Sequence, residues 1–93
     1  MILTYACKDT ERIGKGESTK KWNKQVQTIA MRKLAYLNAA VSLRDLQIPP
    51  SNRLHQLQGD LKGYYSISIN MQWRIIFLWD NGNAFEVKIV DYH

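Results

Sequence analysis

Two adjacent prolines, Pro49 and Pro50, divide this sequence into parts with different periodicities. Proline lacks an N–H group and clashes with the preceding helical turn, so a helix does not continue through the pair. Apolar residues recur at helical spacing before the prolines, whereas the short stretches after them read as strands. This order predicts an α+β fold in which helices cover one face of a mostly antiparallel sheet. The 93 residues are expected to form a single domain, residues 1–93, with one modest core.

The strongest helical signal runs from about Thr19 to Ala40, with Ser18 as the candidate N-cap. Its apolar residues share one face and predict core packing: Trp22, Val26, Ile29, Ala30, Leu34, Leu37 and Val41. The opposite face is expected to be solvated or to contact phosphate, and it carries Lys20, Lys21, Lys24, Arg32 and Lys33. Residues 2–6 are a predicted short strand, residues 8–19 a helical turn or loop, and residues 42–47 one helical turn.

Four strands are predicted after the prolines, at residues 53–57, 64–69, 72–79 and 84–90. The last two flank Asn81-Gly82, a strong hairpin signal. A two-residue loop would place Glu86 and Lys88 among aromatic residues, whereas a three-residue loop, 81–83, separates apolar from charged side chains and is favoured. The inner face then carries Trp73, Ile75, Phe77, Trp79, Phe85, Val87 and Ile89. The outer face carries Arg74, Glu86, Lys88, the uncovered Ile76 and Leu78 and, if the strand continues, Tyr92.

Charge and composition narrow the class of protein. Lys and Arg number 13 against 8 Asp and Glu, and this net charge of +5 favours a polyanionic partner such as nucleic acid. No apolar run is long enough to span a bilayer, and the first residues do not read as a secretory signal. Cys7 is alone, which suits a reducing cytosol, and it is expected to be a buried structural cysteine.

The strongest chemical constellation is a metal-free acid–base set. His55, Asp91 and His93 lack the spacing of metal ligands, so no metal or cofactor is expected. The full set is His55, Arg53, Lys62, Arg74, Asp91, Tyr92 and His93. Cleavage of RNA through its 2′-hydroxyl needs a base, an acid and cations, which histidine and arginine supply near neutral pH. An alternative without chemistry stays open, with His55 an ordinary strand residue and His93 a frayed chain end.

Four stretches, NRLHQLQGDLKG, YSISIN, QWRIIF and the terminal VDYH, resemble the HigB toxins of the RelE/ParE-like superfamily. The resemblance is strong from Lys33 to His93 and weaker before it. It implies a RelE-like fold and a cytoplasmic, ribosome-dependent endoribonuclease toxin that cleaves mRNA in the ribosomal A site. The catalytic residues that it implies are His55, Arg74, Asp91, Tyr92 and His93. Gln58 replaces a basic residue often found before the Gly59-Asp60 turn, and Lys62 could compensate for it.

The resemblance also implies partners. These are a HigA-like helix-turn-helix antitoxin, the small ribosomal subunit and mRNA, with no membrane and with operator DNA bound only through the antitoxin. Contacts with RNA or the ribosome are expected from Lys20, Lys21, Lys24, Arg53 and Lys62. Two alternatives on the same fold stay open, a ParE-like toxin that binds DNA gyrase and a non-catalytic RNA-binding module.

Overall fold

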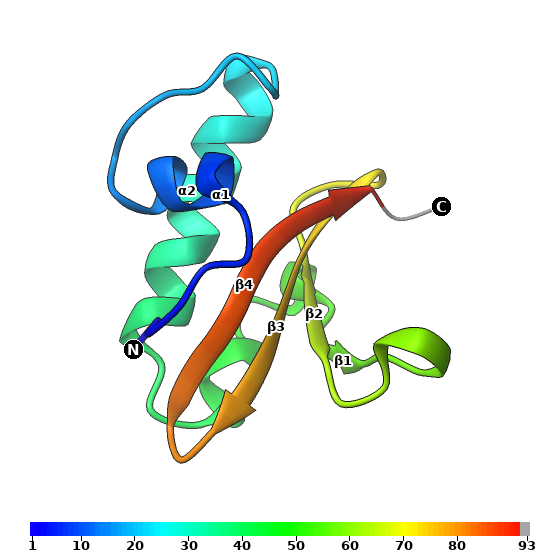
Figure 1. Cartoon of the computed structure of the whole chain (residues 1–93). Helices are drawn as coiled ribbons and strands as arrows, with labels where there is room; N and C mark the ends of the chain where they lie inside the picture. Colours follow the sequence, from blue (N-terminus) through cyan, green and yellow to red (C-terminus); the bar gives the residue numbers. More distant parts are fainter. Residues whose placement is uncertain (92–93) are drawn as a thin grey trace.

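Two helices pack on one face of a four-stranded antiparallel sheet in the computed structural model, which describes residues 1–91 (Figure 1). The helices are α1, Lys8–Gly14, and α2, Lys24–Ala39. The strands pair in the order β1-β2-β3-β4 and span His55–Gln56, Tyr65–Ser68, Trp73–Asp80 and Asn83–Asp91. Three 3₁₀ turns, η1 Leu43–Gln47, η2 Pro50–Asn52 and η3 Gly59–Leu61, lie in the connections. The predicted α+β fold is confirmed.

Helix α2 begins later than predicted. Asn23, not Ser18, is its N-cap, because the Asn23 side chain accepts a hydrogen bond of 2.8 Å from the N–H of Val26. The preceding residues are held in a non-helical conformation by side chains. Thr19 donates a hydrogen bond of 2.6 Å to a carboxylate oxygen of Asp9 in α1, and its backbone N–H donates to Gln27 at 3.0 Å. Side-chain contacts therefore replace the predicted first turn of the helix.

The apolar face of α2 is buried much as predicted. The buried members are Val26, Ala30, Leu34 and Leu37, joined by Trp22 just before the helix, and Ile29 is half-buried. Val41 was predicted in this face but is 79% exposed, because the chain leaves the helix at Ala40. Lys33 was predicted on the basic face opposite the core, but it is buried. It is 3% exposed, and its Nζ donates a hydrogen bond of 2.6 Å to Oδ1 of the buried Asn52.

The loop of the β3–β4 hairpin has two residues, so the predicted three-residue loop is wrong. Asp80 pairs with Asn83 across the loop. Asn81 and Gly82 both adopt positive φ, 54° and 81°. A two-residue hairpin turn whose twist matches that of the flanking strands requires this conformation.

A bulge then corrects the register. Glu86 has φ of 52°, and two residues of β4 stand opposite one residue of β3 at this point. Beyond the bulge, Ile75 pairs with Ile89, which is the predicted register. Between the bulge and the loop, Ala84 is fully buried in the core, whereas Phe85 was the predicted inner residue. Phe85 is only half-buried.

Residues 1–6 lie beside β4 in parallel orientation. They form two isolated bridges, Ile2 with Ala84 and Tyr5 with Val87, rather than the predicted strand. Backbone hydrogen bonds of 2.8–3.2 Å join the two segments. This contact covers the backbone edge that β4 would otherwise expose.

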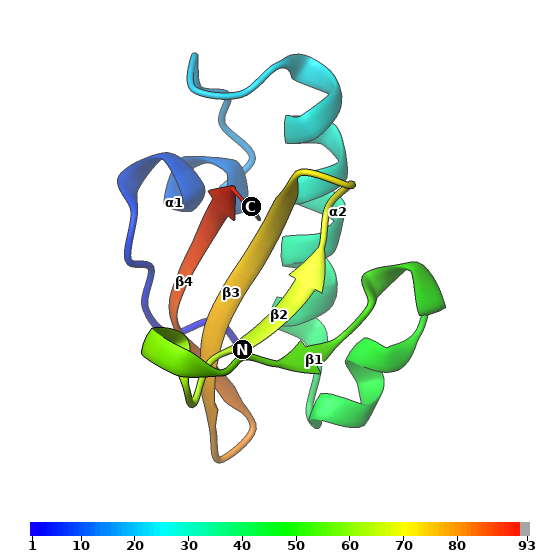
Figure 2. The same cartoon turned by 90° about the vertical axis from the view of Figure 1, so that its right-hand side faces the viewer.

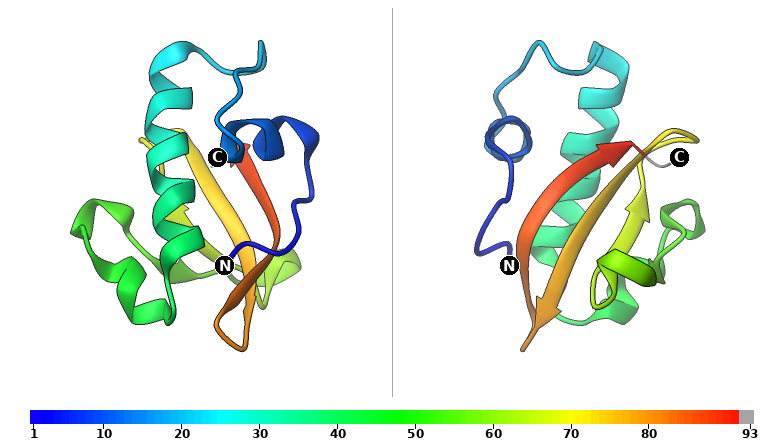
Figure 3. Two further views of the ribbon diagram at one scale, coloured as in Figure 1. Left: turned by 90° about the vertical axis from the view of Figure 1, so that its left-hand side faces the viewer. Right: turned by 45° about the vertical axis from the view of Figure 1, so that its right-hand side comes forward.

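Both helices lie on one side of the sheet and neither lies on the other (Figure 3). Ile76 and Leu78 belong to the outer side, where both were predicted to be uncovered. That prediction is wrong for Ile76, which is 1% exposed, whereas Leu78 is half-buried. Between residues 1 and 91, no helix has both the length and the apolarity needed to cross a membrane.

Candidate active site

Arg74 is a buried cation on the outer side of the sheet. It lies in β3 and is 5% exposed. Its Nε donates a hydrogen bond to Oγ of Ser66 in β2, and its Nη2 donates one of 2.9 Å to the backbone carbonyl of Arg53. A buried guanidinium is stable only when its N–H groups are satisfied, so these acceptors fix where its positive charge lies.

His55 meets Arg74 at the same carbonyl group. Nδ1 of the imidazole lies 3.0 Å from the oxygen of Arg53 and 3.2 Å from Nη2 of Arg74. A carbonyl oxygen can only accept, so the first contact is a hydrogen bond when Nδ1 carries the proton. In this tautomer the lone pair lies on Nε2, which is the nitrogen able to take a proton from a substrate. In the other tautomer, Nδ1 instead accepts a hydrogen bond from Nη2 of Arg74.

The backbone of Arg53 makes this shared acceptor available. Arg53 follows η2 with φ of 48° and ψ of 49°, a left-handed conformation that is uncommon outside glycine. Its own N–H donates 3.0 Å to the carbonyl of Pro50, which holds the turn closed. The turn directs the carbonyl toward Arg74 and His55 while the side chain of Arg53 is exposed. The structure thus brings together three residues of the predicted site.

Asp91 lies at the end of β4, paired with Trp73, the neighbour of Arg74. Gln72 donates a hydrogen bond of 3.1 Å to the exposed carboxylate. The predicted catalytic residues Tyr92 and His93 lie outside the described residues. Within residues 1–91, no three His, Cys, Asp or Glu side chains are grouped as a metal site would require.

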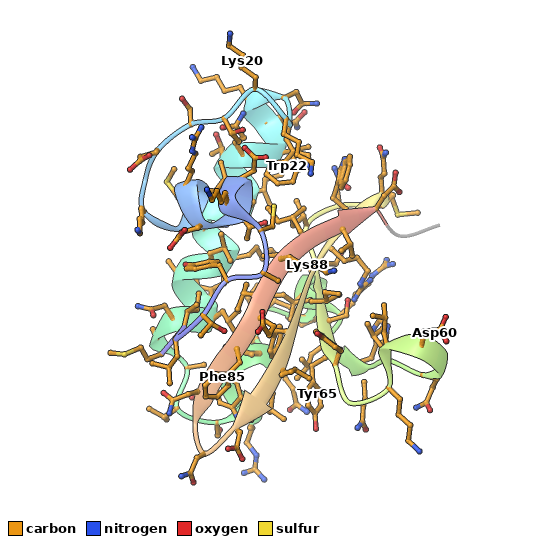
Figure 4. The ribbon with its side chains drawn as sticks, in the orientation of Figure 1. Lys20, Trp22, Asp60, Tyr65, Phe85 and Lys88 are labelled. Atoms are coloured by element: carbon orange, nitrogen blue, oxygen red, sulfur yellow. The ribbon has the colours of Figure 1, made fainter. Side chains whose placement is uncertain are left out.

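The predicted RNA-binding lysines lie in two separate parts of the molecule. Lys20 and Lys21 line a hollow of about 630 Å³ between α1 and the segment before α2, and the exposed Lys24 is the first residue of α2. Lys62 follows η3 at the far side of the molecule, where it is exposed, as is Gln58 before the same turn. In Figure 4, Lys20 and Asp60 of η3 occupy distant ends of the molecule.

Ser66 is a site residue that the sequence reasoning missed. It is fully buried, and its hydroxyl accepts from Nε of Arg74. The alternation of serine and isoleucine in YSISIN was the available signal, because it places Ser66 and Ser68 on the face opposite Ile67. Lys88 lies on the same outer face, paired with Ile76, and adds a half-buried positive charge (Figure 4).

Cys7 differs from the expected buried cysteine, because it is only half-buried at the N-cap of α1. Burial raises the pKa of its thiol. The nearby polar groups of Thr10, the N–H of Asp9 and the charge of Lys21 favour the thiolate, outweigh burial and leave the pKa below its ordinary value.

Comparison with known proteins decides the family. The sequence profile described as "RelE-like toxin of type II toxin-antitoxin system HigB" matches residues 5–93. The chain belongs to the HigB-like toxin family. Toxin HigB-1 of Vibrio cholerae is 48% identical over 64 residues, which span 69% of this chain and 67% of the relative. Endoribonuclease HigB of Proteus vulgaris is 46% identical over 41 residues, 44% of this chain and 45% of the relative.

Solved structures confirm the RelE-like fold of this HigB-like toxin. YafQ from Escherichia coli strain BL21(DE3) has a TM-score of 0.59 at 20% identity and covers 98% of this chain and 91% of its own. The heterotetrameric YoeB-YefM toxin-antitoxin complex from Staphylococcus aureus has a TM-score of 0.61 at 19% identity, with coverages of 100% and 95%. At such identities the likeness concerns the fold.

Proposed function

We propose that this HigB-like toxin cleaves mRNA in the ribosomal A site by attack of a ribose 2′-hydroxyl on the adjacent phosphate, without a metal ion. The observation that carries the proposal is the meeting of Arg74 and His55 at the carbonyl of Arg53. A fixed cation beside a titratable ring suits a reaction that moves protons and gathers negative charge on phosphate. The name of one relative, Endoribonuclease HigB, agrees with this chemistry.

Each residue then has a role. One of the two histidines, His55 or His93, takes the proton of the 2′-hydroxyl as its oxygen bonds to phosphorus. The other gives a proton to the 5′-oxygen as its bond to phosphorus breaks. Arg74 stabilises the charge on the phosphate oxygens, and Asp91 and Tyr92 orient the reacting groups. The products are a 2′,3′-cyclic phosphate and a 5′-hydroxyl.

Dependence on the ribosome is supported by exposed lysines and by the need to orient the RNA. Lys20, Lys21, Lys24 and Lys62 are exposed, so they suit contacts with ribosomal RNA. An open site cannot force free RNA into the geometry for in-line attack. The ribosome can supply that orientation, and positioning is worth on the order of 7 kcal/mol or more in favourable cases.

The test compares cleavage of naked mRNA with cleavage in a translating extract. We expect fast cleavage only in the extract and a loss of about 10²–10³-fold for Arg74→Ala, as for other preorganised donors to developing charge. Arg44→Ala, at an exposed arginine in η1, is the matched control and should retain the wild-type rate. Equal rates on both RNAs would refute ribosome dependence. Inhibited DNA supercoiling without cleavage would indicate a ParE-like toxin, and RNA retention without cleavage a binding module.

The family name places the chain in a type II toxin–antitoxin system. The proposed partner is a HigA-like helix-turn-helix antitoxin that carries the contacts with operator DNA. The half-buried Leu78 and Phe85, which pair on the outer face, offer it apolar area, and the net charge of +5 favours an acidic or mixed-charge surface. Ile76 offers none, because it is buried. Co-expression with the neighbouring gene should yield a co-eluting complex in gel filtration, and a toxin that elutes alone would contradict the proposal.

A further inference from the structure

A second basic hollow lies beside the candidate active site. It has a volume of about 340 Å³ and is bounded by α2, by η2 and by the connection from β2 to β3. In Figure 2, β2 and this connection run alongside α2. Three basic residues line the hollow, namely Arg32 and Lys33 from α2 and Arg53 after η2. The sequence placed Arg32 and Lys33 on one basic helix face but did not join them to Arg53.

The charge of the hollow is not balanced locally. Among its described lining residues none is acidic, and α2 has no Asp or Glu along its length. The pKa of Lys33 responds to its burial and to this surplus of positive charge. Burial lowers the pKa of its ammonium group, and the neighbouring charge of Arg32 lowers it further. A bound anion would offset both effects, because it favours the charged form of the amine.

The other walls suit a nucleotide rather than a bare anion. Ile29, Ile69 and Met71 provide an apolar side, and Met71 is 84% exposed although its side chain is apolar. Ser51, Ser68 and Asn70 provide hydroxyl and amide groups. A thioether adapts its shape to a flat partner, and serine and asparagine can pair with the edges of a base or with a ribose hydroxyl.

Arg53 connects this hollow to Arg74 and His55. The backbone carbonyl of Arg53 accepts hydrogen bonds at the candidate active site. Arg53 is also exposed and lines the hollow. One strand of RNA can therefore contact both places without crossing the body of the protein. An acidic protein surface is a less suitable occupant, because it would leave the apolar side next to Met71 without a specific role.

We propose that the hollow between α2, η2 and the β2–β3 connection binds a nucleotide of the substrate RNA strand, a short distance along the strand from the cleaved bond. Arg32 and Arg53 contact the phosphate, and the apolar wall with Met71 holds the base. The inference rests on the proposed function for the identity of the strand. It goes beyond that function in assigning a binding subsite outside the catalytic residues.

The three methionines of the chain allow a test that does not depend on cleavage. Methyl groups are labelled with ¹³C in the full-length toxin, and a 2′-O-methyl hexanucleotide, which cannot be cleaved, is added. We expect the Met71 methyl signal to shift while those of Met1 and Met31, which lie outside the hollow, stay in place. Arg32→Gln should weaken binding, reduce the Met71 shift and lower the slope of log affinity against log salt by about 0.7, the value for one phosphate contact on a single strand.

Arg44→Gln, again in η1, is the matched control and should bind the hexanucleotide like the wild type. A hexanucleotide that leaves Met71 unshifted, or equal salt slopes for wild type and Arg32→Gln, would overturn the subsite. So would a Met71 signal that responds to the antitoxin and not to RNA. A toxin that fails to cleave mRNA but shows the Met71 shift would refute the proposed activity and leave the subsite standing.

Discussion

Replacing Ser66 by alanine should damage both stability and cleavage. The hydroxyl of Ser66 accepts a hydrogen bond from Nε of Arg74, and the two residues are 0% and 5% exposed. Water therefore has little access to replace the lost acceptor. A hydrogen bond with a charged partner contributes about 1.5–3 kcal/mol to stability. At about 4 °C or more per kcal/mol for a domain of this size, the melting temperature should fall by at least roughly 6 °C.

The effect on cleavage depends on whether the hydroxyl positions the guanidinium. Without Ser66, Nη2 of Arg74 still has the carbonyl of Arg53, so the charge remains near the site, but Nε has lost the acceptor that Ser66 provided. If the activation free energy of cleavage rises by the full 1.5–3 kcal/mol, the rate falls by about 10- to 150-fold. Single-turnover cleavage on programmed ribosomes, below the melting temperature of every variant, measures this rate.

Thr10→Val is the control for destabilisation alone. Thr10 is also fully buried, and its hydroxyl accepts a hydrogen bond of 3.0 Å from the N–H of Ile89, on the helix-covered side of the sheet. Its loss leaves a buried N–H without its acceptor and should cost about 1–3 kcal/mol while the cleavage rate is retained. A Ser66→Ala toxin that melts earlier but cleaves at the wild-type rate would show that the hydroxyl supports the fold and does not position Arg74.

Three further predictions concern other parts of the chain. Deletion of His93 should leave the circular dichroism melt unchanged and slow cleavage by about 10²–10⁴-fold, and an unchanged rate would remove His93 from the mechanism. Glu86→Gly should raise the free energy of unfolding, measured in urea, by about 0.5–1 kcal/mol. The bulge holds Glu86 at φ of 52°, where glycine is unstrained. An unchanged or lower free energy of unfolding would show that Glu86 is not strained. Cys7 should react with iodoacetamide at lower pH in the native toxin than in the urea-unfolded chain, since its folded pKa is lowered and thiolate persists further into acid. Coincident pH profiles would contradict this.

The sequence by itself determined the long helix and the four strands that follow it. The apolar stripe of Val26, Ala30, Leu34 and Leu37 predicted a buried helix face, and the alternation in the last third predicted the strands, because both depend only on the local geometry of the backbone. The likeness of VDYH and QWRIIF to HigB toxins named Arg74 and the terminal residues. None of these signals depends on which residues far apart in the sequence come into contact.

Tertiary contacts decided the rest. The bulge at Glu86 forms where its N–H donates 2.7 Å to the hydroxyl of Thr4, a contact between residues 82 positions apart that no count of hairpin residues could reveal. Lys33 belongs by periodicity to a solvated face, yet the η1–η2 segment folds over it and Asn52 binds its ammonium group. The acceptor shared by Arg74 and His55 is a backbone carbonyl, and every residue has one. Only the left-handed turn at Arg53 aims this carbonyl at the site, so the side-chain sequence carried no sign of it.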